Sequence, residues 1–146
     1  MNAKAYVQGD WVASDRAHTT DAVTIPSLKE SYEKFLALLA RHGIQNVATW
    51  HIEAVGAYGK EGKSKDADVL RNFAQIAEAD CVISRLVQSD PPFKHWGSLA
   101  LMAHAMALGK KCYVIAADDC VVWKSHIMHH PLIVQCADEE ELLKYF

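Results

Sequence analysis

The sequence predicts an α/β fold, a three-layer α/β/α sandwich around a doubly wound, five-stranded parallel sheet of strand order 2-1-3-4-5. Short apolar runs of strand length alternate with segments whose apolar residues recur every three or four positions. This alternation is typical of a parallel sheet covered by helices on both faces. The stretch 79–116 also reads as strand, loop, helix and strand, the pattern of a right-handed crossover between parallel strands.

In the first half of the chain, residues 5–8 are expected to form a strand that ends at Gly9-Asp10. Ser27 and Glu30 then form a capping box after Pro26, which begins a helix. One buried stripe on that helix comprises Leu28, Tyr32, Phe35, Leu36 and Leu39. Gly43 ends the helix, and residues 46–52 are expected to form the second strand.

In the second half, a glycine-rich loop precedes a helix whose predicted buried face comprises Val69, Phe73, Ile76 and Ala77. The apolar segment 96–108 predicts a third, largely buried helix that ends at Gly109. Three further strands are expected over residues 81–84, 112–116 and 132–136, and a short helix over residues 120–124. Asp138 caps a closing helix whose first turn holds three glutamates, where the helix dipole favours negative charge.

Composition indicates one globular domain spanning residues 1–146, because 51% hydrophobic residues suffice for a sizeable core. The net charge of −3 is mild, and no dense basic patch predicts a nucleic-acid partner. No apolar run reaches the roughly 18 residues that a membrane span needs, so no membrane partner is expected. The four cysteines form no CxxC pair and three lie in expected strands, which favours a cytoplasmic protein with buried, reduced thiols.

The candidate site lies where the first and third strands end, because neighbouring carboxyl ends in this strand order frame a ligand crevice. Gly9, Asp10 and Trp11 follow the first strand. The third helix begins at Trp96, Gly97 and Ser98, whose free N–H groups would face an anion, while the tryptophans would stack on a planar base. The alternative is that these residues only cap the helix and pack.

Histidines provide the other candidate chemistry, and here the structural explanations are stronger. His126, His129 and His130 have a spacing that one helix face could share, but Pro131 disfavours helix at His130. No cysteine or carboxylate lies at ligand spacing, so we expect neither a metal nor a cofactor. His104, inside the apolar third helix, is interpreted as a core or interface histidine.

Several motifs resemble the nucleoside 2-deoxyribosyltransferase family and its relatives that hydrolyse the N-glycosidic bond of nucleoside monophosphates. The segment Tyr6–Gly9 resembles the family's first strand, which ends in glycine, and Ala79–Ile83 resembles its Ala-Asp-Val-Val strand. Gly97-Ser98 and Ala107–Lys110 match the beginning and the end of the family's next helix. The resemblance covers residues 5–115 loosely and is closest over residues 71–110.

Two departures from the family pattern bear on activity. Leu101 occupies the position of the glutamate that the family uses as nucleophile, and leucine cannot attack an anomeric carbon. Asn72 stands where the family often has an acidic residue, so it is a candidate ligand-binding residue rather than a base. The resemblance therefore implies a protein that binds a nucleoside, nucleotide or related ribosyl ligand without the family's covalent chemistry, and that forms a homodimer or higher homo-oligomer.

Two other functions stay open. One is an active N-glycosidase or deoxyribosyltransferase in which Asp10, Glu53 or Asp90 supplies the missing carboxylate from another segment. Of these, Asp10 and Asp90 are the leading catalytic candidates. A purely structural interaction domain is the third alternative.

Overall fold

The computed structural model describes residues 2–9, 26–53, 65–86 and 95–146, and within them it shows a five-stranded parallel sheet of order β2-β1-β3-β4-β5. The strands are β1 (Ala3–Gly9), β2 (Ile44–Asn46), β3 (Cys81–Arg85), β4 (Lys111–Ile115) and β5 (Ile133–Cys136). The helices are α1 (Pro26–Arg41), α2 (Trp50–Glu53), α3 (Lys65–Glu78), α4 (Trp96–Ala107), α5 (Glu139–Leu143) and the 3₁₀ turns η2 (Val121–Lys124) and η3 (His126–His129). The predicted fold class and strand order are confirmed.

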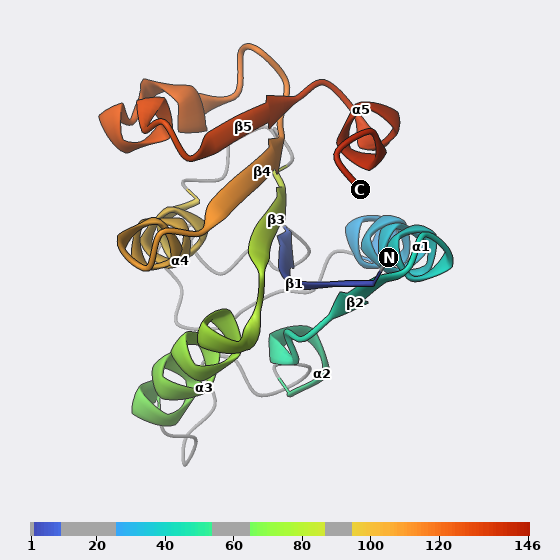
Figure 1. Ribbon diagram of the computed structural model, residues 1–146, viewed down its shortest axis with the longest axis horizontal. Coiled ribbons are helices and arrows are strands. Elements are labelled where there is room, and N and C mark those ends of the chain that lie inside the picture. The colour runs from blue at the N-terminus through green and yellow to red at the C-terminus, as the bar shows by residue number, and fades with distance from the viewer. Residues whose placement is uncertain (1, 10–25, 54–64, 87–94) are drawn as a thin grey trace.

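Helices cover both faces of the sheet and complete the three layers (Figure 1). α1 and α5 lie on one face, whereas α3 and α4 lie on the other. Because all five strands are parallel, and α1 and α4 follow β1 and β3 along the chain, both helices begin at the carboxyl edge of the sheet. Segments far apart in sequence therefore meet at that edge.

The core is built from the three central strands, which are apolar on both faces. Tyr6, Val7, Val82, Ile83 and Val114 have no exposed surface. The stripe predicted on α1 is also confirmed, since Tyr32, Phe35 and Leu39 are buried and Leu28 and Leu36 pack against the core. Strands covered on both faces read as continuous apolar runs, which is why they were recognisable.

The second strand differs from its prediction over residues 46–52, because β2 ends at Asn46 and the helix α2 begins at Trp50. The Asn46 side chain explains the early end. Its Oδ1 accepts from the N–H of Ala48 (2.9 Å), and its Nδ2 donates to the Ala48 carbonyl (3.2 Å). An asparagine that bonds the backbone two residues ahead favours a turn over a continuing strand.

The predicted burial of two helices needs correction. On α3, Ile76 is fully buried and Phe73 half-buried, but Val69 is 49% exposed and Ala77 is exposed, so the predicted face was too wide. α4 buries Met102, Ala105 and Met106, whereas Ala103 is half-buried and Trp96 and Leu108 are exposed. The third helix is thus buried along one face, and its apolar character extends to surface positions.

The predicted helix ends are confirmed. Gly43 and Gly109 follow α1 and α4 with φ angles of 76° and 77°, the left-handed region that glycine enters without a steric penalty. The side chain of Asp138 accepts from the N–H of Glu141 (2.8 Å) and caps α5. The capping interaction expected of Ser27 lies outside the described side chains.

All four cysteines are free and buried, as the sequence predicts. Burial raises the pKa of both Cys81 and Cys112 to about 12, with the Asp80 carboxylate adding to the effect at Cys81. Since the thiolate is the reactive form, these two thiols are inert at neutral pH. None of the described helices is both long and apolar enough to cross a bilayer.

Lys110, the last residue of the Ala107–Lys110 motif, has a structural role at the end of α3. Its Nζ donates to the carbonyls of Ile76 (2.7 Å), Ala77 (2.7 Å) and Ala79 (2.5 Å). The Ile76 carbonyl also accepts from the N–H of Ala79 (3.2 Å). A cation at the end of a helix bonds to carbonyls of the last turn and complements the helix dipole. The lysine of this motif therefore ties α3 to the start of β4.

We expect Lys110→Met to lower the free energy of unfolding by about 2 kcal/mol, because charge-assisted hydrogen bonds are lost. The neighbouring Lys111 is exposed, so Lys111→Met is the matched control and should change stability by less than about 0.5 kcal/mol. Urea denaturation followed by circular dichroism measures both. Equal stabilities for the two variants would contradict the capping role.

Candidate functional site

The carboxyl end of β1 extends beyond its partner β2 and is completed by side chains. The N–H of Val47 donates to the Ala5 carbonyl (2.9 Å), after which β2 supplies no further ladder bonds. The N–H of Val7 then donates to Asn46 Oδ1 (3.2 Å), and its carbonyl accepts from Tyr32 Oη (3.1 Å) and Trp50 Nε1 (2.9 Å). Polar groups of α1 and α2 are thereby held at this strand end, where open α/β folds bind ligands.

An aromatic cluster of Tyr32, Trp50 and His51 covers this strand end. The Tyr32 ring centroid lies 5.5 Å from that of Trp50 and 5.8 Å from that of His51. Burial raises the pKa of Tyr32, so its hydroxyl stays a neutral donor. Burial also lowers the pKa of His51, although the nearby Glu33 carboxylate opposes the shift. The imidazole is therefore neutral at pH 7.

Gly9, the last residue of β1, lies against this cluster. A Cβ atom at Gly9 would come within 2.8 Å of Tyr32 Cδ2 and 3.1 Å of the Arg85 carbonyl oxygen. Because the carbonyl belongs to the neighbouring strand, relief requires the Tyr32 ring to move. The family-like glycine is thus explained by close packing at the strand end.

Gly9→Ala should destabilise the fold by about 1–3 kcal/mol, the usual cost of overpacking a core. The matched control is Gly97→Ala on α4, where the added methyl group meets no atom within 4 Å beyond its chain neighbours and the backbone of its own helix. That change should stabilise the protein by about 0.5–1 kcal/mol, because alanine favours helix over glycine. Thermal unfolding of the two variants gives the comparison, and a neutral or stabilising Gly9→Ala would refute the packing explanation.

On the other face of the sheet, the Gln8 side chain connects β1 and β3 to α4. Its Nε2 donates to Ser84 Oγ (2.8 Å) and to the Ser98 carbonyl (3.1 Å). Both Gln8 and Ser84 are buried, so this small polar network excludes bulk water. It fixes the first turn of α4 beside the ends of β1 and β3.

The start of α4 has an unusual backbone. His95 precedes the helix with φ 59° and ψ 24°, and its side chain makes no capping hydrogen bond to the helix. The His95 ring is buried, with Nε2 3.8 Å from Cys120 Sγ. A left-handed conformation at a residue other than glycine costs energy and is found disproportionately at functional sites. The helix end therefore presents backbone N–H groups and a positive dipole at the carboxyl edge.

Arg85 ends β3 and lies in register with Gly9 on β1. Its Nε donates to Glu139 Oε1 (3.1 Å) and its Nη2 to Ser31 Oγ (2.8 Å). The guanidinium carbon lies 5.8 Å from the centre of the Phe35 ring. One cation is thus held between α1 and α5 at the carboxyl end of the central strand.

The structure brings some of the predicted site residues together. Gly9 and Ser98 both lie where β1 meets α4, because Gln8, the neighbour of Gly9, donates to the Ser98 carbonyl. Trp96 begins α4 and has 68% of its surface exposed. Asn72 lies on α3, where its Oδ1 accepts from Arg71 Nη2 (3.0 Å). Asp10, Trp11 and Asp90 lie outside the described residues, as does the side chain of Glu53. Leu101 is half-buried and packs against the core.

Sequence reasoning missed Gln8, Ser84 and Arg85, which supply most of the polar contacts at this edge. Each is a polar residue inside an apolar strand or at its end, and this position in the sequence could have marked it as a site residue. Trp50 was also missed as a site residue, because its segment was interpreted as a strand. His95 belongs to the loop before the third helix that was selected from the sequence. Nothing in the sequence predicted its left-handed backbone conformation.

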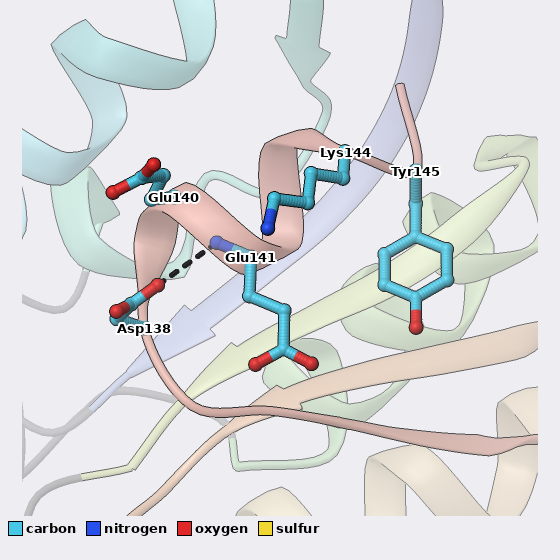
Figure 2. A pocket seen from close by; sticks show the side chains of 5 residues that line it. All are labelled: Asp138, Glu140, Glu141, Lys144 and Tyr145. Carbon is cyan, nitrogen blue, oxygen red and sulfur yellow. Dashed lines mark hydrogen bonds between the residues drawn. The ribbon is translucent and has the colours of Figure 1, made fainter.

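The structure also contains a surface pocket of about 370 Å³ beside α5, lined by Asp138, Glu140, Glu141, Lys144 and Tyr145 (Figure 2). Two of its carboxylates have structural roles, since Asp138 caps the helix and Glu141 Oε2 accepts from the N–H of Ala137 (2.7 Å). Three acidic groups against one lysine would repel an anionic ligand. We therefore place the candidate site at the β1–β3 edge and not in this pocket.

The histidine cluster is exposed. His126 and His129 lie on η3 and His130 follows it. Across residues 2–9, 26–53, 65–86 and 95–146, no three histidine, cysteine or acidic side chains are grouped so as to hold a metal ion. His104 stacks on Phe73 with ring centroids 3.9 Å apart, which fits the predicted packing role.

Fold and site together define a doubly wound α/β protein with its polar groups gathered at the switch point between β1 and β3. No family model and no curated protein matches the chain. Among solved structures, the CMP N-glycosidase BcmB of Clostridium botulinum is similar, with a TM-score of 0.56 and 15% identity over 97% of this chain and 96% of that chain. At this identity the likeness establishes the fold, and the correspondence of Leu101 to a catalytic glutamate stays a prediction.

Proposed function

We propose that this protein binds a nucleoside or nucleotide-like ligand at the carboxyl edge of β1 and β3, without the covalent glycosyl chemistry of the family it resembles. The observation that carries the proposal is the position of the first turn of α4 at this edge, fixed beside Gly9 by the bond from Gln8 Nε2 to the Ser98 carbonyl (3.1 Å). N–H groups there are suited to an anionic or hydroxyl-bearing ligand. The exposed Trp96 indole offers a stacking surface for a base, and the similar CMP N-glycosidase acts on a nucleotide.

The absence of catalysis is argued from Leu101. Its apolar side chain packs against the core on the helix that the resemblance assigns to the nucleophile. Retaining glycosyl chemistry needs a carboxylate about 5 Å from its acid–base partner, and leucine supplies none. Loss of the reactive group with retention of the scaffold corresponds to a sensor or sequestering protein.

An active N-glycosidase with a displaced carboxylate is the second candidate, and one observation favours Glu53 among its residues. Glu53 ends α2, and α2 is held at the carboxyl end of β1 by the bond from Trp50 Nε1 to the Val7 carbonyl. The end of α2 therefore belongs to the segment that lies beside the carboxyl end of β1. Asp10 and Asp90 remain candidates on sequence grounds alone.

We also propose that the chain forms a homodimer or higher homo-oligomer through α3 and α4. Val69 and Leu70 on α3 are 49% and 69% exposed, and Leu108 after α4 is 49% exposed. Large apolar side chains on adjacent helices are typical of subunit interfaces. Light scattering should give at least twice the monomer mass, and Leu70→Glu should reduce it, whereas a monomer at high concentration would contradict the proposal.

The functional proposal is tested by thermal stabilisation across a panel of nucleosides and nucleoside monophosphates, followed by chromatography for free base. We expect saturable stabilisation with no base release. Leu101→Glu should show weak hydrolysis at most, because misplacement of the group by about 1 Å can cost a hundredfold in rate. Turnover by the wild type that is lost in Glu53→Gln would establish the second candidate instead.

A further inference from the structure

We propose that Arg85 and Ser31 form the subsite that binds the anionic phosphate of the ligand, so that the protein prefers nucleoside monophosphates to nucleosides. This inference rests on the proposed function, which leaves open whether a phosphate is present. The same chemistry would suit any phosphorylated ribosyl ligand.

The position of Arg85 suits a ligand in the crevice. It ends the central strand β3 and pairs in register with Gly9 of β1, so it lies at the switch point itself. Successive strand residues point to opposite faces, and the Ser84 side chain contacts the α4 face through Gln8. Arg85 accordingly points to the α1 and α5 face, where Ser31 and Glu139 contact it. A ligand spanning the sheet edge would reach Trp96 on one side and Arg85 on the other.

The guanidinium has donors to spare. Arginine carries five N–H donors and no acceptor. Nε donates to Glu139 and one Nη2 hydrogen to Ser31, while no acceptor for Nη1 is found in the described part of the chain. The Ser31 hydroxyl accepts from Arg85 and thus keeps its own hydrogen as a donor. Arginine and a hydroxyl together match the several acceptor oxygens of a phosphate.

The ion pair with Glu139 orients the Arg85 guanidinium and leaves some of its N–H donors available to a ligand. The Arg85 side chain is 20% exposed and that of Glu139 36%, so the pair is accessible to water and contributes little stability by itself. Glu139 contacts Nε only, which orients the fork and leaves the terminal nitrogens for a ligand. The α4 end carries roughly half an elementary charge, and a guanidinium carries a full one. The charge comparison thus favours Arg85 over the helix end as the phosphate subsite.

The test is calorimetric titration of cytidine monophosphate and cytidine into the full-length protein. Wild type should bind the monophosphate about tenfold to a hundredfold more tightly, the range of charge-assisted hydrogen bonds. Arg85→Gln should reduce that ratio to within about twofold, and Arg85→Lys and Ser31→Ala should lower it part of the way. Arg41→Gln is the control, because Arg41 is an exposed arginine at the opposite end of α1 from the proposed subsite, and it should leave the ratio unchanged.

The possible outcomes separate this inference from the function it rests on. Equal wild-type affinity for the two ligands would overturn the subsite and leave nucleoside binding intact, whereas binding of neither would overturn both. An Arg85→Gln protein that folds and loses both ligands equally would show a structural role and overturn the subsite. If Arg85→Gln fails to fold, the ratio in Arg85→Lys and Ser31→Ala decides, and an unchanged ratio in both overturns the subsite.

Discussion

An Ala105→Arg protein should not fold. Ala105 has no exposed surface and lies in the last turn of α4, between the buried Met102 and Met106, on the helix that packs on β3 and β4. A guanidinium at this position would be buried without a partner and would also overfill a close-packed layer. The cost of several kcal/mol is comparable to the about 5–15 kcal/mol that stabilises a typical domain. Gel filtration and circular dichroism should find aggregated or unfolded protein.

Ala100→Arg is the matched control for that experiment. Ala100 lies on the same helix but is exposed, so an arginine there keeps its charge in water. Its free energy of unfolding should stay within about 0.5 kcal/mol of wild type. A normally folded Ala105→Arg protein would show that α4 does not pack on the sheet as described. An unfolded Ala100→Arg protein would show that burial is not what makes arginine disruptive at residue 105.

Ser98→Trp should weaken nucleotide binding by at least about a hundredfold, because an indole in the first turn of α4 would obstruct the start of the helix. Ser98 is half-buried, and Gln8 holds its carbonyl beside the end of β1. Ala40→Trp adds the same indole near the end of α1, at an exposed position away from this edge, and should bind like wild type. Titration with cytidine monophosphate measures both variants. Wild-type affinity in Ser98→Trp would place the ligand elsewhere, provided that its melting temperature shows an intact fold.

The fold was predictable because its strongest signals are local. The α1 stripe, the glycines after α1 and α4 and the Asp138 cap each express one short-range rule, and all are confirmed. The prediction of the second strand over residues 46–52 was wrong because the Asn46 side chain turns the chain there. The apolar residues that follow had suggested a continuing strand. The predicted burial of Val69 and Ala77 was wrong because the exposure of a helix residue depends on which element packs against it. The periodicity of apolar residues carries no information about that neighbour.

The site was predictable in place but not in detail. Strand order alone locates the crevice between β1 and β3, and the sequence therefore pointed to Gly9 and the start of α4. The bonds of Gln8 to Ser84 and Ser98 join residues 76 and 90 positions apart, so no local pattern reports them. The same holds for Arg85, whose partners Ser31 and Glu139 are each 54 positions away along the chain. The roles of Asn72 and Leu101 stay predictions from the resemblance.

The central claim is a nucleotide site at the β1–β3 edge that binds without cleaving. Its most direct test is a calorimetric titration of wild-type protein with cytidine monophosphate, after which the contents of the same cell are chromatographed for free cytosine. The account predicts a saturable binding isotherm and no cytosine above the level in a protein-free control. Cytosine that accumulates with time, or an isotherm without saturable binding, would contradict it.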